Sequence, residues 1–189
     1  MMFRDLTESE IEIRVGQASE KGVSLLLYKD ARCDMAILDE TVGEENWQNR
    51  FYENKGILFC SLGINTNFAN KDAPDRWIWK DDAGVESSQD AEKGCASDAR
   101  KRSGVSWGIG RELYSAPFIW VTPDKVNLYD TKRKDKYGNP VLSTRVKFAV
   151  EKIVIENKKI VGLSIVNMSI KSDKLSDKRV FVMAPRADA

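Results

Sequence analysis

Short apolar runs separated by turn signals are the sequence feature that most restricts how this chain can fold. Runs with strand character occupy residues 23–29, 46–54, 56–66, 76–80 and 117–121. Two longer strands are expected on either side of a turn at 156–159, and a last strand within 177–183. The turn ENKG at 53–56 is a hairpin signal between two of these runs. The order of elements therefore predicts an α+β fold with an antiparallel sheet.

Helix signals are fewer. A capping box formed by Thr7 and Glu10 predicts a helix start near the N-terminus. A second helix is predicted between the N-cap Asp30 and Gly43, because apolar residues recur at helical spacing and glycine ends the pattern. A third helix is predicted over residues 90–107.

Composition places the chain among globular proteins. Its 189 residues are enough for one domain with a real core, and 42% hydrophobic with 31% charged residues is a usual balance. No apolar run approaches the roughly 20 residues of a membrane span, and the polar N-terminal segment has no signal-peptide core. We therefore expect a cytoplasmic protein. The net charge of +1 means that any binding to nucleic acid must come from local patches.

The chain has no histidine, which removes the commonest general base, the histidine-activated nucleophiles and the usual ligand of catalytic metals. Its three cysteines, Cys33, Cys60 and Cys95, are isolated and odd in number, which argues against a disulfide framework or a zinc site. We expect them to be buried as small apolar residues. These observations predict no catalytic residues, no metal and no cofactor.

A group of carboxylates offers the one alternative from the enzyme class, a metal-dependent nuclease. The stretch that holds them is rich in turns, where Asp is expected for turn formation, and no lysine follows at a suitable spacing for such a site. The group consists of Asp72, Asp75, Asp81, Asp82 and Glu86.

Basic residues gather on the third predicted helix. At about 100° per residue, one side of this helix carries Lys93, Ser97, Arg100, Lys101 and Gly104. The other side has only small residues and could pack closely on a sheet. On the basic side, glycine would let a phosphate approach the backbone. Arg102 points about 100° away from Lys101 around the helix axis, so the two cations cannot contact the same site. An ordinary solvated helix face is the alternative reading.

Aromatic residues and a basic loop leave further alternatives open. Trp77 and Trp79 alternate, so both point to one face of their strand. The aromatic side chains could stack on bases or lie in the core or a subunit interface, and we favour the core for Trp77 and Trp107. The basic residues of the loop 131–140 could contact DNA or simply be solvated: Lys132, Arg133, Lys134 and Lys136.

Two blocks of this sequence resemble the single-strand annealing proteins of the Rad52 superfamily, especially the phage and prophage branch represented by Sak. The first block, 28–51, is similar to a strand–helix unit that ends in glycine, a few polar residues and tryptophan. The second, 77–121, contains SDARKR at 97–102 and GIGRELY at 108–114, which are similar to the motifs of that family. Together the blocks span roughly residues 20–121. We therefore expect one annealing domain over residues 1–189, with a β-rich C-terminal extension from about residue 122 to residue 189.

The resemblance implies a β-sheet packed on a long central helix, assembled side by side into rings or filaments with single-stranded DNA in a basic groove. Lys101 and Arg102 match the Lys-Arg pair that lines this groove, and Lys93 matches an earlier basic position. Eukaryotic members have an arginine where this chain has Cys33, and Arg32, one residue earlier, is the candidate substitute. Arg111 is typical of the phage branch.

The function implied is ATP-independent binding and annealing of single-stranded DNA in recombination and double-strand break repair. Candidate DNA-binding residues are Lys101, Arg102, Lys93, Arg100, Arg111 and Arg32. Expected partners are single-stranded DNA, further copies of the chain and a phage exonuclease or host single-strand-binding protein. No membrane partner is expected. The expected location is the cytoplasm of a bacterial or phage-infected cell. The alternatives are a DNA- or RNA-binding module that does not anneal, and the nuclease.

Overall fold

The computed structural model describes residues 2–70, 72–85 and 91–185, the first three residues of the last range by their backbone only. The chain divides into two compact units. Unit 1 comprises Met1–Asp5 and Lys29–Arg111, and unit 2 comprises Leu6–Tyr28 and Glu112–Ala189. The expectation of one annealing domain over 1–189 stays a prediction.

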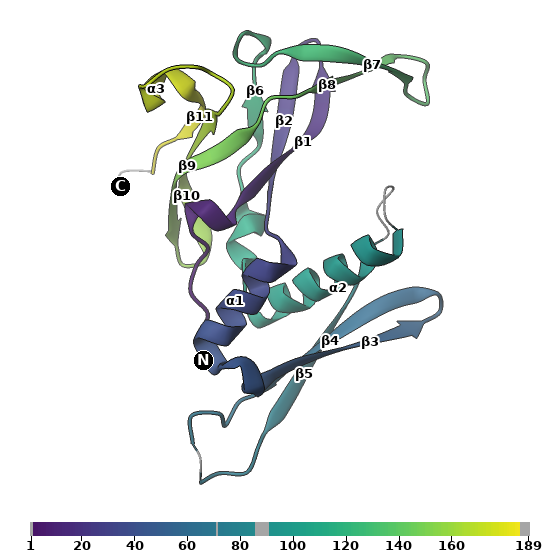
Figure 1. Cartoon of the computed structure of the whole chain (residues 1–189), viewed down its shortest axis with the longest axis vertical. Coiled ribbons are helices and arrows are strands. Elements are labelled where there is room, and N and C mark those ends of the chain that lie inside the picture. The colour runs from purple at the N-terminus through teal and green to yellow at the C-terminus, as the bar shows by residue number, and fades with distance from the viewer. Residues whose placement is uncertain (1, 71, 86–90, 186–189) are drawn as a thin grey trace. The chain divides into compact units, whose positions relative to one another are not determined.

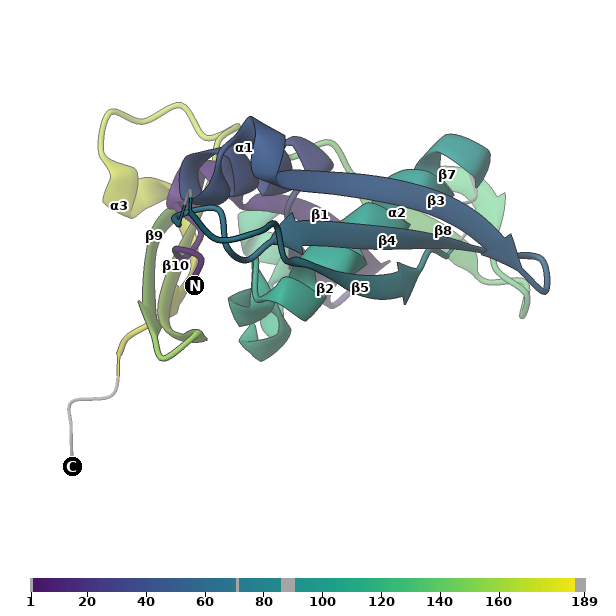
Figure 2. The same ribbon diagram turned by 90° about the horizontal axis from the view of Figure 1, so that it is seen from below.

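Unit 1 consists of two helices and one three-stranded antiparallel sheet. The sheet has the order β3-β4-β5, so β4 is its central strand. Helix α2 contacts β4 and β5, and helix α1 contacts α2 (Figures 1 and 2). The elements are α1 (Ala31–Val42), η2 (Glu44–Asn46), β3 (Trp47–Asn54), β4 (Ile57–Asn65), β5 (Trp77–Ala83) and α2 (Ala91–Trp107).

Local signals set the boundaries of these elements as the sequence predicts. The Asp30 side chain accepts a 2.8 Å hydrogen bond from the Cys33 backbone N–H and so caps α1. Gly43 ends the helix with φ 89°, a conformation that favours glycine. In the β3–β4 turn, Lys55 and Gly56 both have positive φ, 52° and 75°, which confirms the hairpin.

The two faces of this sheet differ because side chains alternate along each strand. On β4, Cys60, Leu62 and Ile64 are buried on the face that contacts α2. Gly63 points to the opposite face, where the Trp79 ring covers it: a Cβ on Gly63 would lie 2.6 Å from the indole. Trp77 stacks beside Trp79 with ring centroids 6.1 Å apart, which confirms that both point to one face.

Unit 2 is built mainly of antiparallel strands. Its sheets have the orders β1-β2-β6, β11-β10-β9 and β7-β8. The strands are β1 (Glu12–Ser19), β2 (Gly22–Tyr28), β6 (Ile119–Val121), β7 (Leu128–Lys134), β8 (Pro140–Thr144), β9 (Phe148–Glu156), β10 (Lys159–Asn167) and β11 (Arg179–Met183). The short helices are η1 (Glu8–Glu10), η4 (Pro123–Lys125) and α3 (Leu175–Lys178), and η3 (Arg111–Ser115) starts at the last residue of unit 1.

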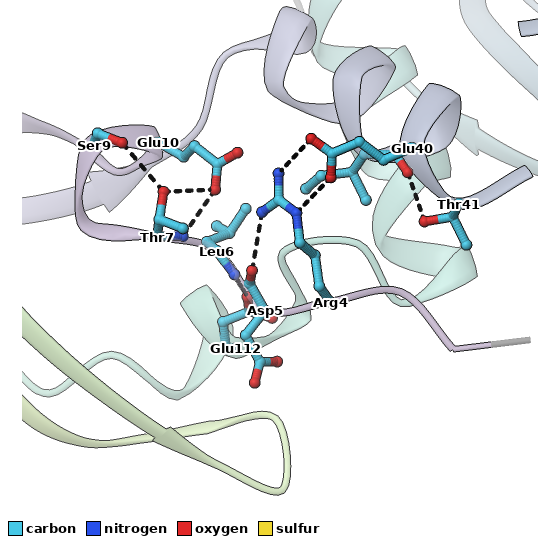
Figure 3. A network of polar contacts seen from close by, with 10 residues as sticks. Arg4, Asp5, Leu6, Thr7, Ser9, Glu10, Glu40, Thr41 and Glu112 are labelled. Atoms are coloured by element: carbon cyan, nitrogen blue, oxygen red, sulfur yellow. Dashed lines mark hydrogen bonds and ion pairs between the residues drawn. The ribbon is translucent and has the colours of Figure 1, made fainter. Parts of the chain in front are cut away.

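Apolar side chains from neighbouring strands form the core of unit 2. The buried residues come mainly from β2, β6 and β10, and they include Val23, Leu25, Ile119, Val121, Ile160, Leu163, Ile165 and Val166. Glu112, at the start of this part of the chain, is fully buried and accepts a 2.7 Å hydrogen bond from the Leu6 backbone N–H (Figure 3). Among the described residues, no helix is both long and apolar enough to cross a membrane.

The α+β class with antiparallel sheets is confirmed, but three local expectations are wrong. The capping box of Thr7 and Glu10 forms (Figure 3), yet it caps only the 3-10 turn η1. The chain enters β1 straight afterwards, because apolar residues then alternate at Ile11, Ile13 and Val15 with a period of two, which favours a strand. The basic segment 131–140 is a hairpin of β7 and β8, and β8 is separate from β9.

Replacing Gly63 by valine should destabilise unit 1, because its Cβ would overlap the Trp79 ring. We expect the free energy of unfolding to fall by about 2 kcal/mol, as for overpacked sites in cores. Ser61→Val is the matched control, since Ser61 lies on the same strand and face and is half-buried. Urea unfolding of both variants measures the effect, and equal stabilities would contradict this packing.

Candidate nucleic-acid interface

Helix α2 is held on the sheet by hydrogen bonds to the backbone of its central strand. Ser103 Oγ donates to the carbonyl of Cys60 at 2.6 Å, and Trp107 Nε1 donates to the carbonyl of Leu62 at 3.0 Å. These bonds come from residues one turn apart on α2 and reach carbonyls two residues apart on β4. Because two successive turns in the C-terminal part of the helix are tied to the strand backbone, the rotation of the helix about its axis is defined.

The side of α2 that faces the sheet is made of small residues, as the sequence predicts. Cys95, Ala99 and Ser103 are all buried, and so are Cys33 and Cys60, which confirms the expected burial of the three thiols. The approach is closest at Gly84 after β5, where a Cβ would lie 2.2 Å from the carbonyl oxygen of Cys95. The lack of bulky side chains at this contact lets the helix backbone lie close to the sheet.

Lys101 and Arg102 diverge on the two flanks of α2. Arg102 Nε lies 3.2 Å from Asp82 Oδ1 on β5, and both side chains are partly exposed. Lys101 is half-buried on the side of α1, where its charge acts on Asp34. No ion pair of Lys101 within 4 Å is found among the described residues. The predicted divergence of these two cations is present in the fold.

Arg100 does not lie on an open face, although the helical spacing predicts it there. Its guanidinium Nη1 lies 3.3 Å from Met35 Sδ of α1, and the group lies 5.7 Å from the Phe51 ring centroid of β3. Its Nε is buried without a hydrogen-bond partner. The flat guanidinium is therefore packed between α1 and β3, so we assign it a structural role in addition to its predicted DNA contact.

Gly104 is also less exposed than its position on the helix predicts. The sequence places it on the basic side, where it would let a phosphate approach, but it is buried. A Cβ at this position would lie 3.0 Å from Asp34 Oδ2 of α1. The absent side chain therefore makes room for α1, and the expectation of phosphate contact at Gly104 is wrong.

A buried ion pair of Lys29 and Asp34 lies at this contact, and sequence reasoning missed it. The Lys29 ammonium contacts Asp34 Oδ1, and their side chains are only 4% and 1% exposed. Asp34 Oδ2 is buried without a partner. Burial raises the pKa of Asp34 to about 6, against the opposing effect of the Lys29 and Lys101 charges. Lysine directly after an apolar strand is the only sequence signal for this pair, and it is weak.

Two side chains bind the carbonyl end of α2. Arg111 donates from Nη2 to the carbonyls of Val105, at 3.1 Å, and Ser106, at 3.2 Å. Lys80 Nζ of β5 donates to the same Ser106 carbonyl at 3.0 Å and lies 4.4 Å from the Trp107 ring centroid. Cations at this end of a helix are favourable because its last carbonyls lack partners. Arg111 thus caps the helix, and Lys80 is a second residue that the sequence reading did not single out.

The remaining predicted cations lie at the starts of the two helices. Arg32 is 88% exposed in the first turn of α1, and its Nε lies 3.1 Å from Asp30 Oδ2. Its neighbour Cys33 is buried, whereas Arg32 is exposed. Arg32 therefore points in a different direction from a side chain at position 33, where eukaryotic members of the similar family have their arginine. Lys93 belongs to the first turn of α2 by its backbone, and its side chain lies outside the described residues.

The acidic group has other roles in the structure. Asp82 pairs with Arg102, Asp81 accepts from the Tyr52 hydroxyl at 2.9 Å, and Asp75 accepts from Asn65 at 2.9 Å. Glu86 lies outside the described residues. In the part of the chain that the structure describes, no three acidic, cysteine or histidine side chains are grouped as a metal site.

Residues 2–133 match the family model described as Rad52/22 family double-strand break repair protein. The matched range includes all of α2, both sequence blocks and the six candidate DNA-binding residues. Comparison with curated proteins finds no match, and comparison with solved structures finds none either.

The buried Asp34 should give the protein an unusual dependence of stability on pH. Its pKa is raised from 3.8 to about 6 in the folded state, so folding favours the protonated form. Its contribution to the free energy of unfolding is fully present below about pH 4 and is lost as the pH rises through about 6. From pH 5 to pH 8 we expect a loss of about 1.4 kcal/mol, because the folded-state pKa lies about one unit above pH 5.

Asp34→Asn removes the titrating group, so this part of the pH dependence should disappear from urea unfolding curves. The control is Glu45→Gln, which removes an exposed carboxylate of η2. If Asp34→Asn and the wild type lose stability in parallel between pH 5 and pH 8, the assignment to Asp34 is wrong.

Proposed function

Because the chain belongs to the Rad52/22 family of double-strand break repair proteins, we propose that it binds single-stranded DNA and anneals complementary strands without ATP. The family assigns the chain to DNA recombination and repair, and the proposal adds the mechanism. The phage and prophage branch of the family is part of the proposal and rests on the motifs at 97–102 and 108–114.

The observation that carries the proposal is the pair of diverging cations on a helix of defined rotation. Phosphates repeat along a single strand, and cations that neutralise them release counterions, which drives binding without base specificity. Lys101 and Arg102 lie on opposite flanks of α2, so they serve successive phosphates better than one phosphate. Their helix is tied to β4 by Ser103 and Trp107, which keeps the spacing of these charges constant.

The other candidates have graded roles in this proposal. Arg32 is almost fully exposed, and its ion pair with Asp30 is of the weak surface kind that a phosphate can replace. Arg111 and Arg100 support α2 through its last carbonyls and through Met35, so they position the helix. Lys93, which belongs to the first turn of α2 by its backbone, is a further proposed DNA contact.

Annealing itself makes and breaks no covalent bond, so the chain needs only to hold one strand extended with its bases free to pair. One chain contacts few nucleotides, and a row of copies would join their basic helices into a continuous surface. We therefore propose a homo-oligomeric ring or filament, in which head-to-tail contacts repeat. An exonuclease or a single-strand-binding protein is the proposed further partner in a bacterial or phage-infected cell.

Candidate contacts for such an assembly are two aromatic residues, the half-buried Trp79 and the exposed Tyr114. Trp79 lies on the face of the β3-β4-β5 sheet opposite α2, with the Arg50 guanidinium 4.2 Å from its ring centroid. Tyr114, in η3, is 72% exposed. Large aromatic side chains that are accessible at the surface are enriched at protein interfaces.

Lys101→Ala and Arg102→Ala should each weaken binding to a labelled oligothymidylate by at least about fivefold, which is about 1 kcal/mol. Both variants should fold, because neither side chain contributes to the small-residue contact of α2 with the sheet. Arg76→Ala removes an exposed cation of unit 1 away from α2 and is the matched control. Fluorescence anisotropy at several salt concentrations measures the affinity, and wild-type affinity in both variants would refute the site.

Light scattering should show a mass well above that of a dimer at micromolar concentration, with growth or rearrangement on addition of single-stranded DNA. Tyr114→Ala and Trp79→Leu should reduce this mass. Tyr137→Ala, which removes an equally exposed aromatic ring, is the control in the absence of DNA. A stable monomer with and without DNA would leave the alternative function, a binding module that coats single strands and does not anneal them.

A further inference from the structure

We propose that the β7–β8 hairpin of unit 2 is a second binding surface for single-stranded nucleic acid, on a different unit from α2. We call it the hairpin surface, and it consists of residues 128–145. The proposal rests on the proposed function for its class of ligand, but it assigns a separate set of residues. The family match ends at 133, within β7, so most of this surface lies beyond it.

The hairpin surface concentrates positive charge in a nearly neutral chain. Residues 128–145 contain five basic and two acidic side chains, a net charge of +3, whereas the whole chain has +1. All five cations are exposed: Lys132, Arg133, Lys134, Lys136 and Arg145. A local excess of this size attracts a polyanion even where the chain as a whole does not.

The two carboxylates of the hairpin accept hydrogen bonds from its backbone N–H groups. They therefore leave most of the positive charge of the hairpin surface without an ion pair. Asp135 accepts from the backbone N–H groups of Asn139 and Tyr137, at 2.9 and 2.8 Å, and these bonds hold the pKa of Asp135 below its usual range. Asp130 accepts from the Lys132 N–H at 2.7 Å and pairs with the Lys132 ammonium. Within the described residues, Arg133, Lys134 and Lys136 have no such ion pair.

The hairpin is an ordered scaffold for these cations. Lys132 has φ 62°, and the register shifts between Asp130 and Lys134, which marks a bulge in β7. Thr131 Oγ1 closes the bulge with a 2.6 Å hydrogen bond to the Val141 carbonyl. Because side chain–backbone bonds hold both the bulge and the turn, binding a strand would cost little ordering of the protein backbone.

Aromatic rings lie beside the cations, which favours nucleic acid over an acidic protein segment. The Lys136 ammonium lies 4.9 Å from the Tyr137 ring centroid, and the Arg145 guanidinium lies 5.1 Å from that of Tyr129. Both tyrosines are exposed. Surfaces for single strands combine cations for the phosphates with aromatic rings on which bases stack, whereas an acidic peptide needs only the cations.

A hollow at the base of the hairpin can receive one base. Its volume is about 400 Å³, and its walls are formed by Asn127, Leu128, Tyr129, Arg145, Val146 and Ser169. This size falls within the range of small-molecule sites. Tyr129 and Arg145 provide flat groups for stacking, and the amide of Asn127 and the hydroxyl of Ser169 provide donors and acceptors for a base edge.

The test compares a hairpin variant with a matched control. The variant combines Arg133→Gln, Lys134→Gln and Lys136→Gln, and a second variant is Tyr129→Leu. The control combines Lys152→Gln, Lys159→Gln and Lys171→Gln, which removes three exposed cations of unit 2 outside the hairpin surface. All are compared with the wild type by anisotropy with a thirty-nucleotide oligothymidylate over a salt series.

We expect the hairpin variant to bind about tenfold more weakly at moderate salt. Its salt slope should be smaller by about two, since each of the three lost phosphate contacts lowers the slope on a single strand by about 0.7. Tyr129→Leu should lose at least about fivefold through lost stacking. The control should bind within about twofold of the wild type. Photocrosslinking to an iodouracil-substituted strand should label the peptide that contains Tyr129.

Each contrary result has a definite meaning. If the hairpin variant keeps wild-type affinity and salt slope while Lys101→Ala loses affinity, the hairpin surface is refuted and the proposed function stands. If the wild type does not bind the oligonucleotide, both are refuted. If the hairpin variant loses binding only to polyglutamate, the surface binds acidic protein and the inference is wrong.

Discussion

The close contact between α2 and β4 is the interaction on which the candidate DNA interface depends. Small side chains bring the helix backbone near the strand, and Ser103 and Trp107 donate to carbonyls of β4. A carbonyl oxygen has two lone pairs, so a strand within a sheet can still accept such bonds. The two bonds define the rotation of the helix, and that rotation determines where each of its cations lies. Basic residues that would be a diffuse charge on a mobile helix thereby become groups at constant positions.

The same contact explains why the basic side of α2 is not uniformly open. Helix α1 packs against α2 at Gly104, and the buried pair of Lys29 and Asp34 lies at this contact. Arg100 is half-buried and packs on Met35, whereas Lys101 lies on the side of α1 and Arg102 points toward Asp82. A buried carboxylate with one unpartnered oxygen is costly, and the positive charges of Lys29 and Lys101 reduce this cost. The charge of Lys101, a proposed DNA contact, thus also acts on the buried Asp34 within unit 1.

The two units carry basic surfaces of different construction. On α2 the cations belong to a helix held by its packing, and the nearby aromatic residues Phe51 and Trp107 contact cations within unit 1. On the β7–β8 hairpin, side chain–backbone hydrogen bonds build the scaffold, and the aromatic rings of Tyr129 and Tyr137 are exposed. An annealing protein has to handle two strands, and two separate surfaces on each chain would suit that requirement.

Much of this protein is determined by local sequence. Asp30 and Gly43 set the ends of α1, Gly56 sets the β3–β4 turn, and the spacing of Cys95, Ala99 and Ser103 defines the packing side of α2, because caps, turns and periodicity act over a few residues. Only the tertiary structure decided that Gly104 faces Asp34, that Arg100 packs on Met35 and that 131–140 forms a hairpin. Each of these depends on which distant segment packs against a residue, and periodicity along one element carries no information about its neighbours.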